Sequence, residues 1–166
     1  MTHITGFDRR NWRHWLAFGF GSGLAPKAPG TFGTLAAIPF YLLIAPLAWP
    51  SYLGLIVVLT ILGIWVCDRT ARELGAKDPS AIVWDEFIGF FITMLPVSAT
   101  VLTATHGWIW VVAGFLAFRL FDIWKPWPIR VIDERVGGGL GIMLDDVLAG
   151  LMAAAVLWLA IRFGVS

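Results

Sequence analysis

Charged residues are scarce in this sequence of 166 residues, where they make up only 14% of the chain. A soluble domain carries about 25% charged residues, so this chain could not cover an ordinary globular core with a polar surface. Hydrophobic residues make up 58% of it and the mean hydropathy is +0.79, which also excludes intrinsic disorder. The composition therefore predicts a protein whose solvent is largely lipid.

Cysteine and histidine are also few. The single cysteine, Cys67, excludes a disulfide-stapled secreted domain. Four residues separate it from Arg72, so the five-residue phosphate loop of cysteine phosphatases is not formed. The three histidines, His3, His14 and His106, lie outside the charged clusters, which argues against histidine-dependent phosphatases and zinc sites. A net charge of only +1 offers no basic footprint, so we expect no nucleic-acid partner.

Long apolar runs are what the sequence does have. They lie at residues 31–49, 51–67, 87–105, 107–118 and 147–161. A membrane-spanning helix needs about 20 apolar residues, so the last two runs are short for full spans. Pro39 and Pro46 are expected to kink or break the first run, and Pro96 interrupts the third. No repeat or long linker divides the chain, so we expect a single membrane domain over residues 1–166.

The charged residues gather in three segments between these runs. Of the 12 basic residues, all but Arg162 lie before residue 31, in residues 68–86 or in residues 119–146, and all 11 acidic residues lie there too. By the positive-inside rule, these three segments are expected to face the cytoplasm. The sequence thus predicts an apolar bundle with one polar, cytoplasmic end.

Two glycine-rich segments are candidates for anion binding. They are Gly19-Phe-Gly-Ser-Gly23, which is followed by Ala28-Pro-Gly-Thr31, and Gly137-Gly-Gly-Leu-Gly141. Glycines let backbone amides approach a ligand, and the N-terminus of a helix beginning near Thr31 would favour an anion. The alternative for the first segment is a turn at a helix start, with Thr31 as the N-cap. It has the spacing of neither a Walker A loop nor a dinucleotide fingerprint.

Three charged clusters border the apolar runs. They are Asp85-Glu86 after Trp84, the group Arg119, Asp122 and Lys125 at i, i+3 and i+6, and Asp145-Asp146, expected to open the last helix. Vicinal carboxylates suit a hard cation such as Mg²⁺. The alternatives are helix capping by the acidic pairs, and an Arg119–Asp122 ion pair beside a snorkelling Lys125, in a helix ended by Pro126 and Pro128.

Taken in order, four motifs resemble those of the phosphatidylglycerophosphatase A family. The motifs are GFGSG with APGT, VWDE, FRLFDIWKPWPI and GGGLGIMLDD, and the resemblance runs from about Trp15 to Gly150. It implies a Mg²⁺-dependent phosphatase of phospholipid biosynthesis, which converts phosphatidylglycerophosphate to phosphatidylglycerol at the bacterial inner membrane. It also implies an all-α bundle of about five to six helices, one central and surrounded by the others, with the active site at the cytoplasmic end.

The resemblance further implies which residues form the site. The metal would be held by Asp85, Glu86, Asp122, Asp145 and Asp146; the catalytic residues would be Asp85, Glu86, Asp122, Lys125 and Asp146; and the phosphate would be bound by Arg119, Lys125, Gly21, Ser22, Gly23 and Thr31. Asp85 is the candidate base, and the shared pattern leaves the other roles open. From apolar composition alone, we expect the acyl chains to lie against the runs beginning at Thr31 and Phe87.

Two other functions fit parts of the sequence. Asp68-Arg-Thr-Ala-Arg72 is similar to the opening of the CDP-alcohol phosphotransferase motif, yet the later glycine and spaced aspartates of that motif do not follow. A small transporter or scaffold with a cytoplasmic acidic cation site is the alternative outside the enzymes. Such a transporter should carry ionisable residues near the middle of its spans, whereas here they gather at one end.

Overall fold

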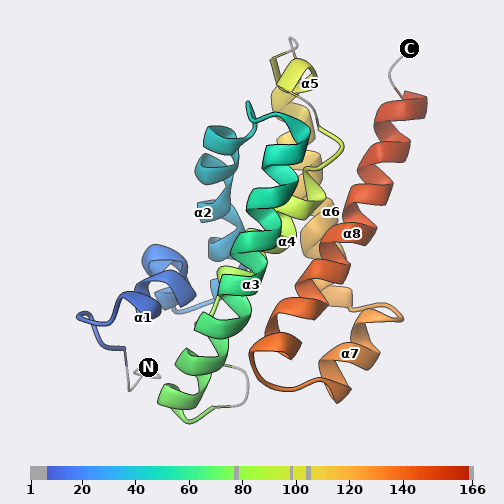
Figure 1. The fold of residues 1–166 in the computed structure, drawn as a ribbon. Helices are drawn as coiled ribbons and strands as arrows, with labels where there is room; N and C mark the ends of the chain where they lie inside the picture. Colours follow the sequence, from blue (N-terminus) through green and yellow to red (C-terminus); the bar gives the residue numbers. More distant parts are fainter. Residues whose placement is uncertain (1–6, 77–78, 98, 104–105, 165–166) are drawn as a thin grey trace.

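The structure, a computed structural model, describes residues 7–76, 79–97, 99–103 and 106–164. Every regular element in these residues is a helix, so the all-α prediction is confirmed (Figure 1). His3, the loop charges Lys77 and Asp78, and residues 104–105 at the end of the third apolar run lie outside the described residues.

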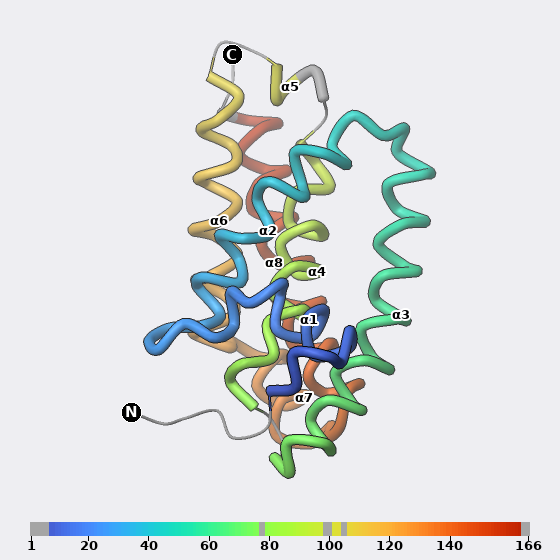
Figure 2. Tube along the Cα trace, turned by 90° about the vertical axis from the view of Figure 1, so that its left-hand side faces the viewer, coloured from blue at the N-terminus to red at the C-terminus, as the bar shows by residue number. Residues whose placement is uncertain are grey.

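Five helices of ten or more residues form the body of the described chain. They are α2 (Pro29–Ile44), α3 (Trp49–Leu74), α4 (Trp84–Thr93), α6 (Gly107–Trp124) and α8 (Gly138–Gly164). Four short helices accompany them: α1 (Trp12–Ala17), the 3₁₀ helix η1 (Gly19–Leu24), α5 (Ala99–Thr103) and α7 (Ile129–Arg135). The short helices α1, η1 and α7 lie toward one end of the bundle and α5 lies at the other (Figures 1 and 2).

Helix α4 is the central helix. It packs against α2, α3, α6 and α8, and all of its residues except Asp85 are buried. The crossing with α8 is close because Gly89 and Gly150 face each other without side chains, and a Cβ atom on Gly150 would meet the Gly89 carbonyl. This close crossing brings the first turn of α4 beside the acidic residues of α8.

The third apolar run does not form one long helix. Helix α4 ends at Thr93, a turn follows, and α5 begins only at Ala99. Pro96 lies in this turn, and a proline disfavours helical geometry in the residue before it, as well as removing a hydrogen-bond donor. The first part of this run therefore forms the short buried helix α4, which is too short to span a membrane.

Three helices of the described chain are long and apolar enough to cross a membrane: α3, α6 and α8. Helices α3 and α6 continue beyond their apolar runs and include the charged residues that follow them. Each contains an ion pair between neighbouring turns, Asp68–Arg72 at 2.9 Å in α3 and Arg119–Asp122 in α6, and such pairs stabilise a helix. Helix α6 then ends at Trp124, before Pro126, as predicted.

Exposed tryptophans mark two levels along the bundle. Trp49 and Trp65 lie sixteen positions apart on α3, and Trp108 and Trp124 lie sixteen positions apart on α6. At a helical rise of 1.5 Å, each pair spans about 24 Å, close to the thickness of the hydrocarbon core between two aromatic belts. The acidic residues lie near the level of Trp65 and Trp124, at the polar end of the bundle.

The start of α2 differs from the expected one. The helix begins at Pro29, and Ala28 is its N-cap in a left-handed conformation with φ 48°, so Thr31 lies in the first turn and is not the N-cap. A proline fits the first helical position because its fixed φ is already helical. Pro39 stays inside α2, whereas Pro46 lies in the turn before α3.

A polar cluster fastens α1 to the end of α3. The His14 ring lies 2.8 Å from Oε2 of Glu73, and Arg13 donates to Oε1 of the same carboxylate at 2.7 Å. The Asp8 backbone amide donates to Nδ1 of His14 at 3.0 Å. These partners give His14 a structural role, and Glu73 lies outside the three charged clusters that border the apolar runs.

Candidate active site

Three carboxylates from two helices meet at the polar end of the bundle. Asp85 and Glu86 lie in the first turn of α4, Asp146 lies on α8, and one oxygen of each lies within 4.8 Å of the other two. Asp145 and Asp146 do not open the last helix as expected, because α8 already begins at Gly138. Their position two turns inside α8 places Asp146 opposite the start of α4.

These carboxylates have little solvent to stabilise their charge. Glu86 is 9% exposed and Asp146 is 3% exposed. Burial raises the pKa of Asp85 well above its usual value, and repulsion from Glu86 and Asp146 adds to the shift. Burial likewise raises the pKa of Glu86 to about 7, although a hydrogen bond from Asp85 and the charge of Arg119 oppose this. The protein alone therefore does not stabilise all three carboxylates in their charged form.

Arg119 faces the cluster from α6. Its Nη1 atom lies 2.5 Å from Oδ2 of Asp122 and 3.9 Å from Oε1 of Glu86. The ion pair with Asp122 that one interpretation predicted is thus present, and the same guanidinium also approaches the carboxylate cluster. Nε of Arg119 is buried and has no hydrogen-bond partner among the described residues, so this donor is available to an anion.

Lys125 approaches from the end of α6. It is the C-cap of the helix with φ 45°, and its Nζ atom donates to Asp145 Oδ2 at 2.7 Å and to Asp133 Oδ1 at 2.8 Å. Partial burial opposes the charge, but these two carboxylates outweigh it and hold the pKa of Lys125 above its usual value. Lys125 therefore stays charged and points toward Asp145. It does not extend toward the membrane surface, as the alternative of a snorkelling side chain would require.

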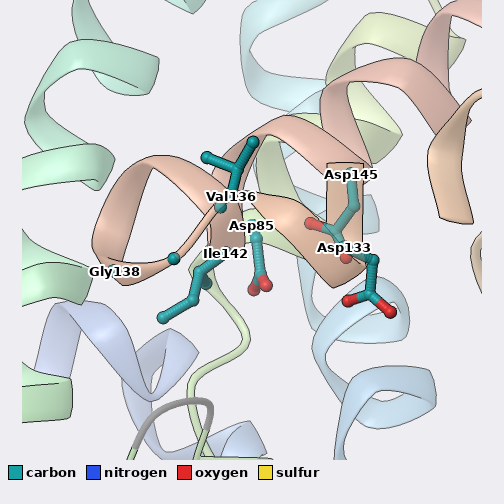
Figure 3. Close-up of a pocket in the computed structure, with 8 residues that line it drawn as sticks. Asp85, Asp133, Val136, Gly138, Ile142 and Asp145 are labelled. Atoms are coloured by element: carbon teal, nitrogen blue, oxygen red, sulfur yellow. The ribbon is translucent and has the colours of Figure 1, made fainter. Parts of the chain in front are cut away.

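A small cavity of about 40 Å³ lies beside these groups (Figure 3). Asp85, Asp133 and Asp145 line it with their carboxylates, together with Gly138 and Ile142. Asp133 was not among the predicted site residues, because its position on the separate helix α7 becomes meaningful only once α7 folds back against α8. The cavity gives the carboxylates access from outside the bundle.

The glycine segments contribute differently from what the sequence predicts. The Ser22 hydroxyl donates to the Gly19 carbonyl at 2.8 Å, Gly23 lies against Ala81, and the segment packs against α1 and α2. No described contact joins Gly21 or Thr31 to the carboxylates. The phosphate-binding role predicted for Gly21, Ser22, Gly23 and Thr31 stays a prediction.

The glycine that the structure does bring to the site is Gly30, which sequence reasoning missed. A Cβ atom there would overlap Oε1 of Glu86 and lie 3.1 Å from Nη1 of Arg119. Gly30 thus lets α2 approach the site without displacing Glu86. The APGT motif contains this residue, but only the packing of α2 against α4 shows why it is a glycine.

The second glycine segment and Asp68 together form the start of α8. The Gly139 amide donates to Oδ1 of Asp68 at 3.2 Å, and the other Asp68 oxygen pairs with Arg72. Gly138 has φ 70°, a left-handed conformation that favours glycine. Asp68 and Arg72 therefore hold α8 against α3, and this contact accounts for the residues that are similar to the CDP-alcohol phosphotransferase motif.

The carboxylate cluster has the donors that a hard divalent cation requires. Asp85 Oδ1 and Glu86 Oε2 are buried and have no hydrogen-bond partner among the described residues. Buried carboxylate oxygens are normally paired or bound to a metal, and an all-oxygen set suits Mg²⁺ better than Zn²⁺. Asp122 and Asp145 lie outside this group of three and each pairs closely with a basic side chain, although Oδ1 of Asp145 is likewise buried without a hydrogen-bond partner.

The raised pKa values of Asp85 and Glu86 predict how stability depends on pH without metal. The folded protein keeps protons that the unfolded chain has already lost above about pH 4.5, so its stability should fall as pH rises toward 7. In detergent with a chelator, we expect a higher melting temperature at about pH 5 than at about pH 8. The Asp85→Asn/Glu86→Gln double variant should show a smaller difference, and an equal or higher melting temperature at the higher pH would contradict the prediction.

Comparisons with known proteins assign the chain to a family. The sequence profile described as Phosphatidylglycerophosphatase A matches residues 15–161, which include every residue of the carboxylate cluster. This chain belongs to the phosphatidylglycerophosphatase A family. Membership makes it an enzyme, a phosphoric monoester hydrolase, and confirms the resemblance drawn from the four motifs.

The alignments with three relatives cover most of each relative and most of this chain. Phosphatidylglycerophosphatase A of Escherichia coli K12 is 51% identical over 87% of this chain and 81% of its own, and that of Haemophilus influenzae is 42% identical over 87% and 86%. A Bacteroides thetaiotaomicron protein, provisionally named a phosphatidylinositol-3-phosphatase, is 41% identical over 82% and 85%. No solved structure matches this chain.

Proposed function

We propose that this protein hydrolyses phosphatidylglycerophosphate to phosphatidylglycerol and inorganic phosphate in phospholipid biosynthesis. The observation that carries the proposal is the meeting of Asp85, Glu86 and Asp146 beside Arg119, in a chain that belongs to this phosphatase family. In the reaction, the oxygen of water forms a bond to phosphorus, the bond from phosphorus to the terminal glycerol oxygen breaks, and that oxygen takes up a proton.

The same three carboxylates are the proposed ligands of Mg²⁺. Two of them offer buried oxygens without hydrogen-bond partners, and all three offer oxygen atoms only. When bound, Mg²⁺ supplies Lewis-acid polarisation of phosphate oxygens and neutralises their charge. Asp122 and Asp145 are then proposed to orient the cationic side chains, since each is already paired with one.

The chain's own residues bind the phosphate and move a proton in this proposal. Arg119 donates to a phosphate oxygen through its unpartnered Nε, and it is held in place by Asp122. Lys125, fixed between Asp133 and Asp145, adds positive charge near the cavity. Asp85 lines this cavity with its carboxylate, which places it to accept the proton that the attacking water loses.

The depth of the site suits a lipid headgroup. The carboxylates lie near the level of the exposed Trp65 and Trp124, and tryptophan is enriched where the bilayer meets water. The polar end also carries basic residues such as Arg72, Arg130 and Arg135, so the positive-inside rule supports a site that faces the cytoplasm. A bacterial inner membrane fits the E. coli relative.

Two competing functions can be separated from this one. Family membership favours an enzyme over the transporter or scaffold that the sequence left open. Within the enzymes, the name of the Bacteroides relative suggests a phosphoinositide as a second substrate. We propose phosphatidylglycerophosphate because the family profile and the relatives at 51% and 42% identity carry that name.

The test is phosphate release by the purified protein in detergent micelles, with Mg²⁺ or with a chelator. We expect release from phosphatidylglycerophosphate that requires Mg²⁺, and a lower kcat/KM for phosphatidylinositol 3-phosphate. Release that persists in the chelator would remove the metal from the proposal. No release with any divalent cation, from protein that melts cooperatively, would contradict the proposed function and favour the transporter or scaffold.

A further inference from the structure

An apolar groove of about 280 Å³ lies between α3, α4 and α8. Its walls are Leu53, Ile56, Val57, Thr60 and Ile61 of α3 and Val147 and Leu151 of α8, with Ile92 and Leu95 from the segment of α4. The one hydroxyl in this lining, that of Thr60, donates to the Ile56 carbonyl at 2.7 Å. The groove therefore offers no hydrogen bond to water, and only an apolar occupant suits it.

The groove exists because α3 and α8 touch at one end and diverge at the other. At the polar end, Gly63 lies against Met143 and Gly139 lies against Asp68, so the two helices are in close contact. Toward Trp49, the backbone of α3 diverges from α8 (Figure 2), and α3 reaches α4 through the long side chain of Tyr52, whose hydroxyl donates to the Phe91 carbonyl at 2.8 Å. The lining residues of α3 begin at Ile61, two residues from the Gly63 contact, where the separation starts.

The groove is continuous with the proposed active site and has the depth of a lipid leaflet. Val147 directly follows Asp146, so one end of the groove lies within a helical turn of the carboxylate cluster. From Ile61 to Leu53 it extends about 12 Å along α3 at a rise of 1.5 Å per residue, close to the ~15 Å of one leaflet of hydrocarbon. Both α3 and α8 are long and apolar enough to span a membrane.

The geometry points to this groove as the binding site for one acyl chain of the lipid phosphomonoester. The inference rests on the proposed function and names where the apolar part of that substrate is held. The headgroup of phosphatidylglycerophosphate has a glycerol, a phosphodiester and a second glycerol between its acyl chains and its terminal phosphate. This length lets a chain occupy the groove while the phosphate reaches the carboxylates about one turn away.

The expected acyl contacts are thereby revised. The run beginning at Phe87 contributes Ile92 and Leu95 to the groove, but the run beginning at Thr31 contributes none of its lining. Most of the walls come from α3 and α8. These helices were not singled out because their divergence cannot be read from their apolar sequences.

The groove is expected to position the substrate's headgroup more than to increase the affinity for its acyl chain. An acyl chain gains little by leaving other lipid tails, which are as apolar as the groove. Walls on three sides, however, restrict the chain and so fix the height and direction of its headgroup, and a small misplacement of a reacting group is costly. Filling the groove should therefore lower kcat/KM for substrates that have chains and spare those that have none.

The experiment compares two neighbouring valines of α3. Val57 lines the groove and is 50% exposed, whereas Val58 is 61% exposed and lies outside it. We expect Val57→Trp to lower kcat/KM for long-chain phosphatidylglycerophosphate at least ~10-fold, and to leave kcat/KM unchanged for its deacylated headgroup, glycerophosphoglycerophosphate. Val58→Trp should leave both values unchanged, because its indole would face the surrounding detergent or lipid.

The outcomes distinguish a failure of the proposed function from a failure of the acyl site alone. No phosphate release by the wild-type protein from either substrate would overturn the proposed function and the acyl site with it. An active wild type whose Val57→Trp and Val58→Trp variants behave alike would overturn the acyl site alone. So would a Val57→Trp variant that loses activity equally on both substrates, since that effect cannot come from an acyl chain.

Cross-linking of the wild-type protein provides a measurement that does not depend on the folding of a variant. Phosphatidylglycerophosphate with a diazirine in one acyl chain should label residues 53–61 or 147–151, and unlabelled phosphatidylglycerophosphate should compete better than phosphatidylcholine. Labelling confined to α6, or equal competition by both lipids, would overturn the inference. Disulfide-linked dimers of a Val57→Cys variant in membranes would place a second copy of the chain in the groove and overturn it as well.

Discussion

Phosphate release by Asp85→Asn and by Asp146→Asn is expected to be at least ~100-fold slower than that of the wild type, as for the loss of a catalytic group. Each substitution keeps the shape of the side chain but removes one of three carboxylates that lie within 4.8 Å of one another. The measurement is kcat with saturating Mg²⁺ at matched protein concentration. Near-native turnover by either variant would remove that residue from the proposed site.

A stability measurement separates a functional role from a structural one. The burial and the repulsion that raise the pKa of Asp85 destabilise the metal-free protein, so Asp85→Asn should melt at the same or a higher temperature while its activity falls. Glu134→Gln is the matched control, because Glu134 is an exposed acid paired with Arg130 and lies outside the carboxylate cluster. Its turnover should equal that of the wild type. A large fall in melting temperature with lost activity would instead indicate a structural role.

Replacing Gly30 with alanine is expected to lower kcat/KM by about 100-fold in a protein that still folds, the effect of misplacing a reacting group by about 1 Å. The added methyl group would overlap Oε1 of Glu86 and crowd Arg119. Because Oε1 is the far end of a flexible side chain, Glu86 can swing away at small cost, and alanine also favours the helix. Catalysis should suffer much more than stability.

Gly54→Ala is the matched control for this substitution. Gly54 lies in α3, and a Cβ atom there would meet nothing within 4 Å. We expect wild-type kcat/KM and an equal or slightly higher melting temperature for this variant. Wild-type activity of Gly30→Ala would show that the position of Glu86 does not matter, whereas its failure to fold would show that Gly30 is needed for packing.

The helical class, the apolar surface and the polar end of the bundle could be predicted from the sequence. Apolar content and the spacing of charges are local properties, so the runs on α3, α6 and α8 could be recognised without knowing what they touch. The motifs also pointed to Asp85, Glu86 and Asp146, which the fold does bring together. Helix ends were less predictable, because α8 begins at Gly138, well before the acidic pair that was expected to open it.

The tertiary structure alone decided which charged groups become neighbours. Asp145 and Asp146 are adjacent in sequence, yet on a helix they point about 100° apart, so one pairs with Lys125 and the other faces Asp85 and Glu86. Gly30 reaches Glu86, and the groove opens, only through the crossing and divergence of whole helices. Such contacts depend on the packing of distant segments, which no local pattern of residues contains.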